Sequence, residues 1–67
     1  MKTQTEIKAG MKFYDAYSGV HTITGVTEKY IEHEWWDEQR RRHNTGCVML
    51  RKTFDKFLAR NIICLVF

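Results

Sequence analysis

Residues 12–36 constrain the fold more than any other part of the chain, because three β-like segments follow one another there between turns. The second segment, residues 20–27, is rich in β-branched side chains, which favour a pleated strand surface. Gly19 ends the turn before it and can adopt a positive φ at little cost. The chain contains no proline that would interrupt a strand. This pattern predicts a small antiparallel β domain with strands over residues 11–15, 20–27 and 30–36.

Two features of this segment predict which side chains face the core. Gly25 interrupts the second strand, and a glycine inside a strand is typical of a β-bulge. A bulge there lets Ile23 and Val26 both face inward despite their odd separation. In the third strand the alternating glutamates mark the solvent face, so Trp35 is expected to be more buried than Trp36.

The second half of the chain predicts a loop, a helix and two further strands. Residues 37–46 carry no apolar side chain and are interpreted as a polar loop, followed by a short strand over residues 47–49. Apolar side chains then recur at helical spacing, which predicts a helix over residues 51–60 with Asn61 as a left-handed cap. Residues 62–67 are hydrophobic and predict the last strand, which closes a barrel if it pairs with the first.

The same patterns predict the side chains of the hydrophobic core. Alternate strand positions and the apolar face of the helix are directed inward. Large aromatic rings let a small core bury more area per residue. Cys47 and Cys64 are interpreted as small buried side chains with reduced thiols. The expected core consists of Phe13, Ile23, Val26, Ile31, Trp35, Val48, Leu50, Phe54, Phe57, Leu58, Ile63 and Leu65.

The order of these elements resembles that of an SH3-like small barrel. Residues 8–26, KAGMKFYDAYSGVHTITGV, also resemble the opening of many short open reading frames of phages and mobile elements. Those openings read roughly as Gly-x-x-Phe/Tyr-x-Asp, a Ser-Gly turn and an alternating strand, and Phe54, Phe57 and Leu58 match their later helix. The resemblance implies a mainly β, SH3-like antiparallel barrel of about five strands with one short helix before the last strand. It also implies a phage or mobile-element origin, but it transfers no functional residue, because a fold does not determine a function.

The length of 67 residues allows one domain, which we expect to span residues 10–67. Residues 1–9 are interpreted as a lead-in segment whose order the sequence leaves open, with Ile7 as the first candidate for the core. No apolar segment has the length of a signal-peptide core or of a membrane span. A cytoplasmic protein without membrane contact is therefore expected.

Charge is distributed unevenly along the chain. Residues 1–39 carry four lysines against seven acids, a net charge of −3, whereas residues 40–67 carry seven Lys and Arg side chains against Asp55 alone, a net charge of +6. A basic surface attracts nucleic acid or an acidic protein. Arginine bonds phosphate bidentately, and an exposed indole can stack on a base. The candidate binding residues are therefore Arg40, Arg41, Arg42, His43, Trp36, Arg51, Lys52, Lys56 and Arg60.

Other interpretations of these residues remain open. In one, the loop arginines pair with Glu34, Asp37 and Glu38 and only keep the loop solvated. In another, an edge strand of the sheet binds a protein partner, with Tyr17 and Tyr30 as secondary contact residues. A homodimer built through an edge strand is a further alternative.

Residues that could carry catalysis or bind metals are few and scattered. No Cys-x-x-Cys or His-x-x-x-His pair is present, so neither a metal site nor a cofactor is predicted. Ser18 lies in a turn without the context of a nucleophile elbow, and His33 is interpreted as a hydrogen-bonded histidine at the core edge. The sequence therefore predicts a non-catalytic binding module, an accessory protein that engages nucleic acid or a nucleic-acid-binding protein complex. The alternative is a protein-binding adaptor or inhibitor that pairs an edge strand or blocks a partner's surface.

Overall fold

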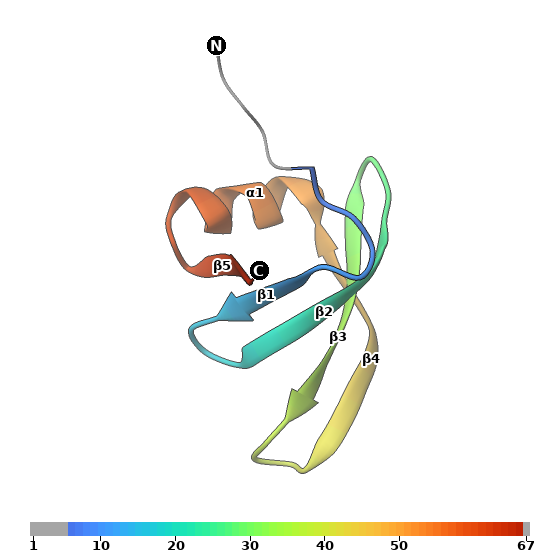
Figure 1. Cartoon of the computed structure of the whole chain (residues 1–67), viewed down its shortest axis with the longest axis vertical. Helices are drawn as coiled ribbons and strands as arrows, with labels where there is room; N and C mark the ends of the chain where they lie inside the picture. Colours follow the sequence, from blue (N-terminus) through green and yellow to red (C-terminus); the bar gives the residue numbers. More distant parts are fainter. Residues whose placement is uncertain (1–5, 67) are drawn as a thin grey trace.

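The structure, a computed structural model, describes residues 6–66 as one five-stranded antiparallel sheet with one helix (Figure 1). Its elements are β1 (Lys12–Asp15), β2 (Gly19–Val26), β3 (Tyr30–Asp37), β4 (Arg42–Leu50), α1 (Arg51–Ala59) and β5 (Ile63–Val66). The strands lie in the order β4-β3-β2-β1-β5, so the first four form a meander and the last returns beside β1. Residues 1–5 of the lead-in segment and residue 67 of the last predicted strand lie outside the described residues.

The sheet is open at β4 and β5, its two edge strands. Within residues 6–66 no ladder joins these two strands. β5 pairs with β1, as expected, from Val66 opposite Lys12 to Ile63 opposite Asp15. α1 links the two edges and packs against β3, β4 and β5. A mainly β chain with one helix before the last strand is thus confirmed, whereas the closure of an SH3-like barrel is not, because a helix and not a ladder bridges the edges.

The first half of the sheet forms as the local sequence predicts. In the β1–β2 turn, Oδ1 of Asp15 accepts a hydrogen bond from the backbone N–H of Tyr17 at 2.7 Å. Further along β2, the register with β3 shifts between Ile23 and Gly25. Ile23 is buried and Val26 packs against the same core, which confirms the predicted bulge.

The β3–β4 hairpin is much longer than predicted. β3 extends to Asp37 and β4 begins at Arg42, so the prediction of a polar loop over residues 37–46 is wrong. Only residues 38–41 form the turn between the two strands. The far part of the hairpin projects beyond the rest of the sheet (Figure 1), and both of its faces are largely solvated. A strand that is exposed on both faces lacks the apolar alternation by which strands are identified.

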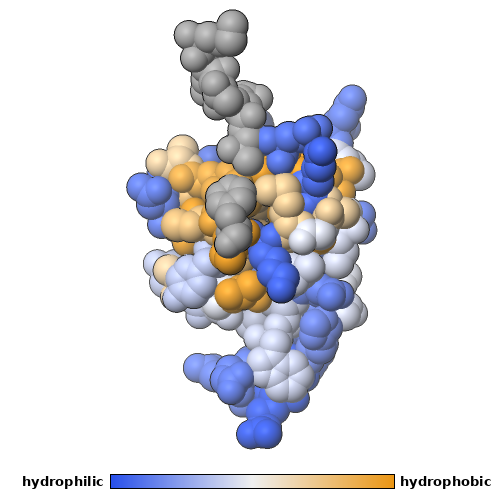
Figure 2. All heavy atoms as spheres, viewed as in Figure 1, coloured by the Kyte–Doolittle hydropathy of each residue, from blue (hydrophilic) through white to orange (hydrophobic). Residues whose placement is uncertain are grey.

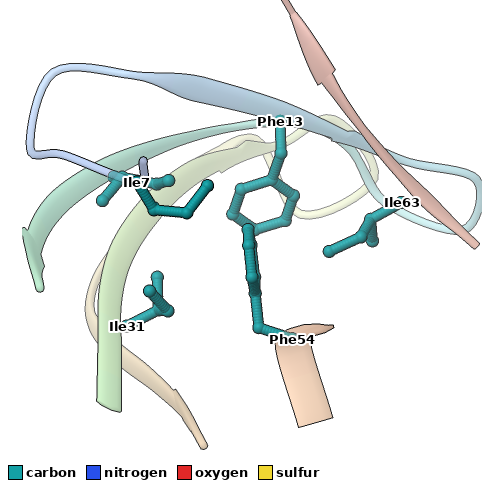
Figure 3. Packing of buried hydrophobic residues seen from close by; sticks show 6 residues of the cluster. Ile7, Phe13, Ile31, Phe54 and Ile63 are labelled. Carbon is teal, nitrogen blue, oxygen red and sulfur yellow. The ribbon is translucent and has the colours of Figure 1, made fainter. Parts of the chain in front are cut away.

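The core lies between the sheet and α1. Figure 3 shows Phe54 of α1 directed at Phe13 of β1, and their ring centroids lie 5.4 Å apart in an edge-to-face arrangement. Trp35 is only partly buried. The buried apolar side chains are Ile7, Phe13, Ile23, Ile31, Phe54 and Ile63, and Met11, Val26, Met49, Phe57, Leu58, Ile62 and Leu65 pack against them.

The predicted core is wrong on β4 and at one cysteine. Val48 and Leu50 are 56% and 52% exposed, and Met49 packs against the core in their place. Gly46, at φ 68°, lies where the register between β3 and β4 shifts, and a shift of one residue exchanges the faces of the side chains beyond it. Cys64 is exposed because it lies on the outer face of β5.

The C-terminus of α1 lies within one residue of the predicted end of the helix. It is closed by a Schellman motif, in which the N–H of Ile62 donates to the carbonyl of Phe57 and the N–H of Asn61 to that of Leu58. Asn61 adopts φ 60°, which confirms the predicted left-handed cap. The motif reverses the chain, so that β5 can return to β1.

Candidate functional site

The end of the β3–β4 hairpin is a tight turn organised by one aspartate. Oδ1 of Asp37 accepts hydrogen bonds from the backbone N–H groups of Gln39 and Arg40, both at 3.1 Å. Arg41 adopts φ 52°, in the left-handed region, and Arg42 pairs with Asp37 as the first residue of β4. We call Arg40, Arg41 and Arg42 the arginine tip; it lies at the end of the molecule opposite α1 (Figure 1).

The acids beside the arginine tip are bound to other groups. The indole N–H of Trp36 donates to Oε2 of Glu38 at 2.7 Å, and Oε1 of Glu34 lies 3.5 Å from Nε2 of His43. Asp37 holds the backbone of the turn. Among residues 6–66, no ion pair includes a guanidinium group of the arginine tip. The alternative in which the local acids pair with these arginines therefore finds no support, and the three guanidinium groups are available to a ligand.

Trp36 and His43 lie opposite each other on the outer face of the same hairpin. Trp36 is 49% exposed, whereas Trp35 is partly buried on the inner face, which confirms the predicted order of burial. Because the indole N–H of Trp36 is bound to Glu38, the faces of its ring are the part that can contact a ligand. The structure thus brings Trp36, His43 and the arginine tip together on one hairpin.

The cations of α1 form a separate surface. Nε of Arg51 lies 3.2 Å from Oδ1 of Asp55 one turn further along, while Lys52, Lys56 and Arg60 are exposed. In Figure 2, which shows one face of the whole molecule, strongly hydrophilic side chains lie near the top and at the bottom, and apolar side chains gather in the part between them. The structure does not bring the helix cations and the arginine tip together.

A hollow of about 450 Å³ lies between the β1–β2 turn and the end of the β3–β4 hairpin. Tyr17, which is 91% exposed, belongs to the first of these turns. Tyr30, the other secondary contact residue, lies at the start of β3 opposite Leu50 and outside this hollow. The lining consists of Tyr17, Ser18, Trp35, Asp37, Glu38, Gln39 and Arg40.

Two histidines form a buried polar pair next to this hollow. Nδ1 of His21 lies 3.0 Å from Nδ1 of His33, and Nε2 of His21 lies 2.6 Å from Oγ of Ser18. The ring of His21 stacks on both Phe13 and Trp35, at centroid distances of 4.7 and 5.1 Å. His33 faces inward and is hydrogen-bonded, as predicted. His21 was not among the predicted core or binding residues, although strand alternation places it on the inward face of β2.

Burial disfavours the protonated form of both histidine rings. Loss of hydration lowers the pKa of His21, the neighbouring His33 lowers it further, and the carboxylate of Asp15 opposes both effects. Loss of hydration also lowers the pKa of His33, again opposed by Asp15. Between two neutral rings one Nδ1 donates its proton and the other accepts it.

Within residues 6–66, no group of three or more His, Cys, Asp or Glu side chains converges where a metal ion could bind. Cys47 and Cys64 are free thiols. None of the helical structure described here is long and apolar enough to cross a membrane.

Comparisons of the chain with protein-family models, with curated proteins and with solved structures found no match. The resemblance to short reading frames of phages and mobile elements therefore stays a prediction.

Proposed function

We propose that this chain is a binding module that engages nucleic acid through the arginine tip and Trp36. The observation that carries the proposal is the pairing of the nearby acids with groups other than the arginines, which leaves three adjacent guanidinium groups charged and exposed. The sequence resemblance supports an accessory protein of phage or mobile-element type, which acts on nucleic acid directly or within a nucleic-acid-binding protein complex.

Binding rests on phosphate neutralisation with aromatic support. Each guanidinium group can form two parallel hydrogen bonds with one phosphate. The exposed ring of Trp36 offers a face for stacking, which contributes about 1–3 kcal/mol per base. Because a base inside a duplex cannot reach that ring, single strands are expected to bind more tightly than duplexes.

The scaffold that we propose is an SH3-like small barrel with an open seam. Its support is the strand order, in which a four-strand meander is completed by β5 beside β1 after a single helix. In this arrangement the core anchors the base of the β3–β4 hairpin and leaves its end free for a ligand.

Fluorescence anisotropy with short labelled single strands and duplexes tests this function. If each residue of the arginine tip neutralises one phosphate, affinity falls by about 20- to 40-fold between about 50 and 200 mM salt. An affinity that does not change over this range, or the absence of binding at low salt, would refute the proposal.

Two matched triple variants separate the hairpin from net charge. One replaces all three residues of the arginine tip by alanine, and the other replaces Lys52, Lys56 and Arg60 by alanine, so each removes three positive charges. The first is expected to lose at least about tenfold in affinity, or ~1.4 kcal/mol, and the second less than about threefold. All six side chains are exposed, so both variants should retain their stability. Equal losses would show that net charge alone, and not the hairpin, attracts the ligand.

A second candidate function is a protein-binding adaptor or inhibitor. The observation that favours it is an edge strand of nine residues, β4, which is paired on one side only and carries the exposed side chains of Val48 and Leu50. Immobilised protein incubated with nuclease-treated lysate distinguishes the two functions. A stoichiometric partner that survives nuclease and is lost on Val48→Pro, which removes a backbone donor from the edge strand, favours the adaptor.

A further inference from the structure

We propose that Ser18 is a nucleophile that accepts an acyl group from an activated ester, with His21 as its general base. This activity goes beyond nucleic-acid binding and does not depend on the arginine tip. The side chains form a continuous series, from Oγ of Ser18 to Nε2 of His21 at 2.6 Å and from Nδ1 of His21 to Nδ1 of His33 at 3.0 Å. A hydroxyl, a base and a group that orients the base are the parts that activate a serine on unrelated folds.

General-base action requires one assignment of the protons. Oγ of Ser18 lies 2.6 Å from Nε2 of His21, a distance that either direction of donation allows, and we take Ser18 as the donor. Nδ1 of His21 then carries a proton and donates it to Nδ1 of His33, whose own proton is on Nε2. The lone pair that a general base needs thus already faces the hydroxyl group.

The surroundings hold the base in place and keep it neutral. The rings of Phe13 and Trp35 stack on His21, so its plane is fixed. Burial lowers the pKa of His21, which leaves its Nε2 free to take a proton at neutral pH. The charged groups that face this region are the carboxylate of Asp15 from β1, which raises the pKa of both histidines, and Asp37, Glu38 and Arg40 across the hollow.

A substrate can reach the hydroxyl through the hollow between the two turns. Ser18 is part of the wall of this hollow, whose volume of about 450 Å³ is larger than a small acyl group needs. Tyr17 and Trp35 line the same space and supply aromatic surface. The expected substrate class is an ester with a good leaving group and a small or aromatic acyl group.

The reaction consists of two steps, acylation of Ser18 and hydrolysis of the acyl-serine. Oγ of Ser18 bonds to the carbonyl carbon while Nε2 of His21 takes the hydroxyl proton. The bond from that carbon to the alcohol oxygen then breaks, and His21 gives the proton to the departing alcohol. Water attacks the acyl-serine in the same way, which releases the acid and restores Ser18. His33 is a positioning residue, because it accepts the Nδ1 proton of His21 and stabilises the imidazolium.

Acetylation by p-nitrophenyl acetate tests the proposal when it is quenched with acid before the acetyl-serine is hydrolysed, and peptide mass spectrometry then locates the acetyl group. The acetyl group is expected on Ser18 at least about a hundredfold faster than on the exposed hydroxyl of Thr24, and His21→Asn should remove that advantage. His33→Asn places an amide oxygen where Nδ1 lies, so it should retain more of the rate than His33→Leu, and the rate should rise with pH as His21 loses its proton. Acetylation of Ser18 no faster than that of Thr24 would overturn the proposal.

A second variant, Ser18→Cys, tests His21 as the base without relying on the reactivity of serine or on the folding of the His21→Asn variant. In Ser18→Cys the introduced thiol lies beside His21, which should take its proton and form a thiolate–imidazolium pair. At about pH 6, where an ordinary thiol of pKa ~8.5 is protonated, iodoacetamide should alkylate it at least about tenfold faster than the exposed Cys64 of the same molecule. An alkylation rate equal to or below that of Cys64 would show that His21 does not act as a base.

Discussion

The two ends of this molecule are stabilised by different interactions. At one end, β1, β5 and α1 enclose apolar side chains, among them Phe13, Phe54 and Ile63. At the other end, the β3–β4 hairpin extends past this core and is held by its backbone ladder and by the turn that Asp37 organises. A hairpin anchored at its base can therefore carry unpaired charges at its tip, because no side chain there has to be buried for the chain to fold.

Removal of a core side chain is expected to have the largest effect. Phe54 is fully buried against Phe13, and Phe54→Ala should cost about 3–5 kcal/mol. The core of so short a chain supplies only about 3–5 kcal/mol in total, so far-UV circular dichroism should show a largely unfolded protein.

The outer face of β4 provides the contrasting substitution. Val48→Ala should change the free energy of unfolding in urea by no more than about 0.5 kcal/mol, since this side chain is more than half exposed. A loss comparable to that of Phe54→Ala would place Val48 in the core after all and would remove the distinction between the two faces.

Substitution of Gly46 should destabilise the hairpin by an intermediate amount. An added Cβ meets no atom within 4 Å, so the cost of Gly46→Ala is that of an L side chain at φ 68°, about 1–2 kcal/mol. Asparagine tolerates this conformation better, so Gly46→Asn is the matched control. The urea midpoint of the alanine variant should be lower than that of the asparagine variant. Identical midpoints would show that strain of the left-handed backbone is not the cause of the lost stability.

Acidification should destabilise the protein by a smaller amount. The pKa values of His21 and His33 are lowered in the folded state, so below about pH 6.5 the unfolded chain binds more protons and the free energy of unfolding falls. The fall should be limited at first, because a single proton still leaves one Nδ1–H to donate to the other Nδ1. Urea unfolding at several pH values measures the effect. A free energy of unfolding that does not fall between about pH 6.5 and about pH 5 would show that burial of the two rings does not oppose their protonation.

The elements that rest on local chemistry could be predicted from the sequence. Strand alternation, the glycine bulge that lets Ile23 and Val26 share a face, and the left-handed Asn61 after the helix all follow from neighbouring residues. Which set of β4 side chains faces the core could not be predicted in this way. A register shift of one residue beside Gly46 directs Met49 inward in place of Val48, and either set would present apolar side chains to the core.

The function proposed for the hairpin depends on contacts that no sequence pattern specifies. The sequence identified the arginine tip and Trp36, but it allowed the nearby acids to pair with the arginines. Only the geometry shows that Glu38 binds Trp36 and that Glu34 lies beside His43. The alternation of β2 indicates that His21 faces inward, but its hydrogen bond to Ser18 depends on how the β1–β2 turn folds back.

We propose that the end of the β3–β4 hairpin, and not α1, is the surface that meets nucleic acid. Titration of the isotope-labelled protein with a short single-stranded oligonucleotide, followed residue by residue by NMR, tests it most directly. We expect the largest shift changes at the backbone amides of residues 36–43 and at the indole of Trp36, with small changes along α1. Changes centred on α1, or no change at low salt, would contradict the account.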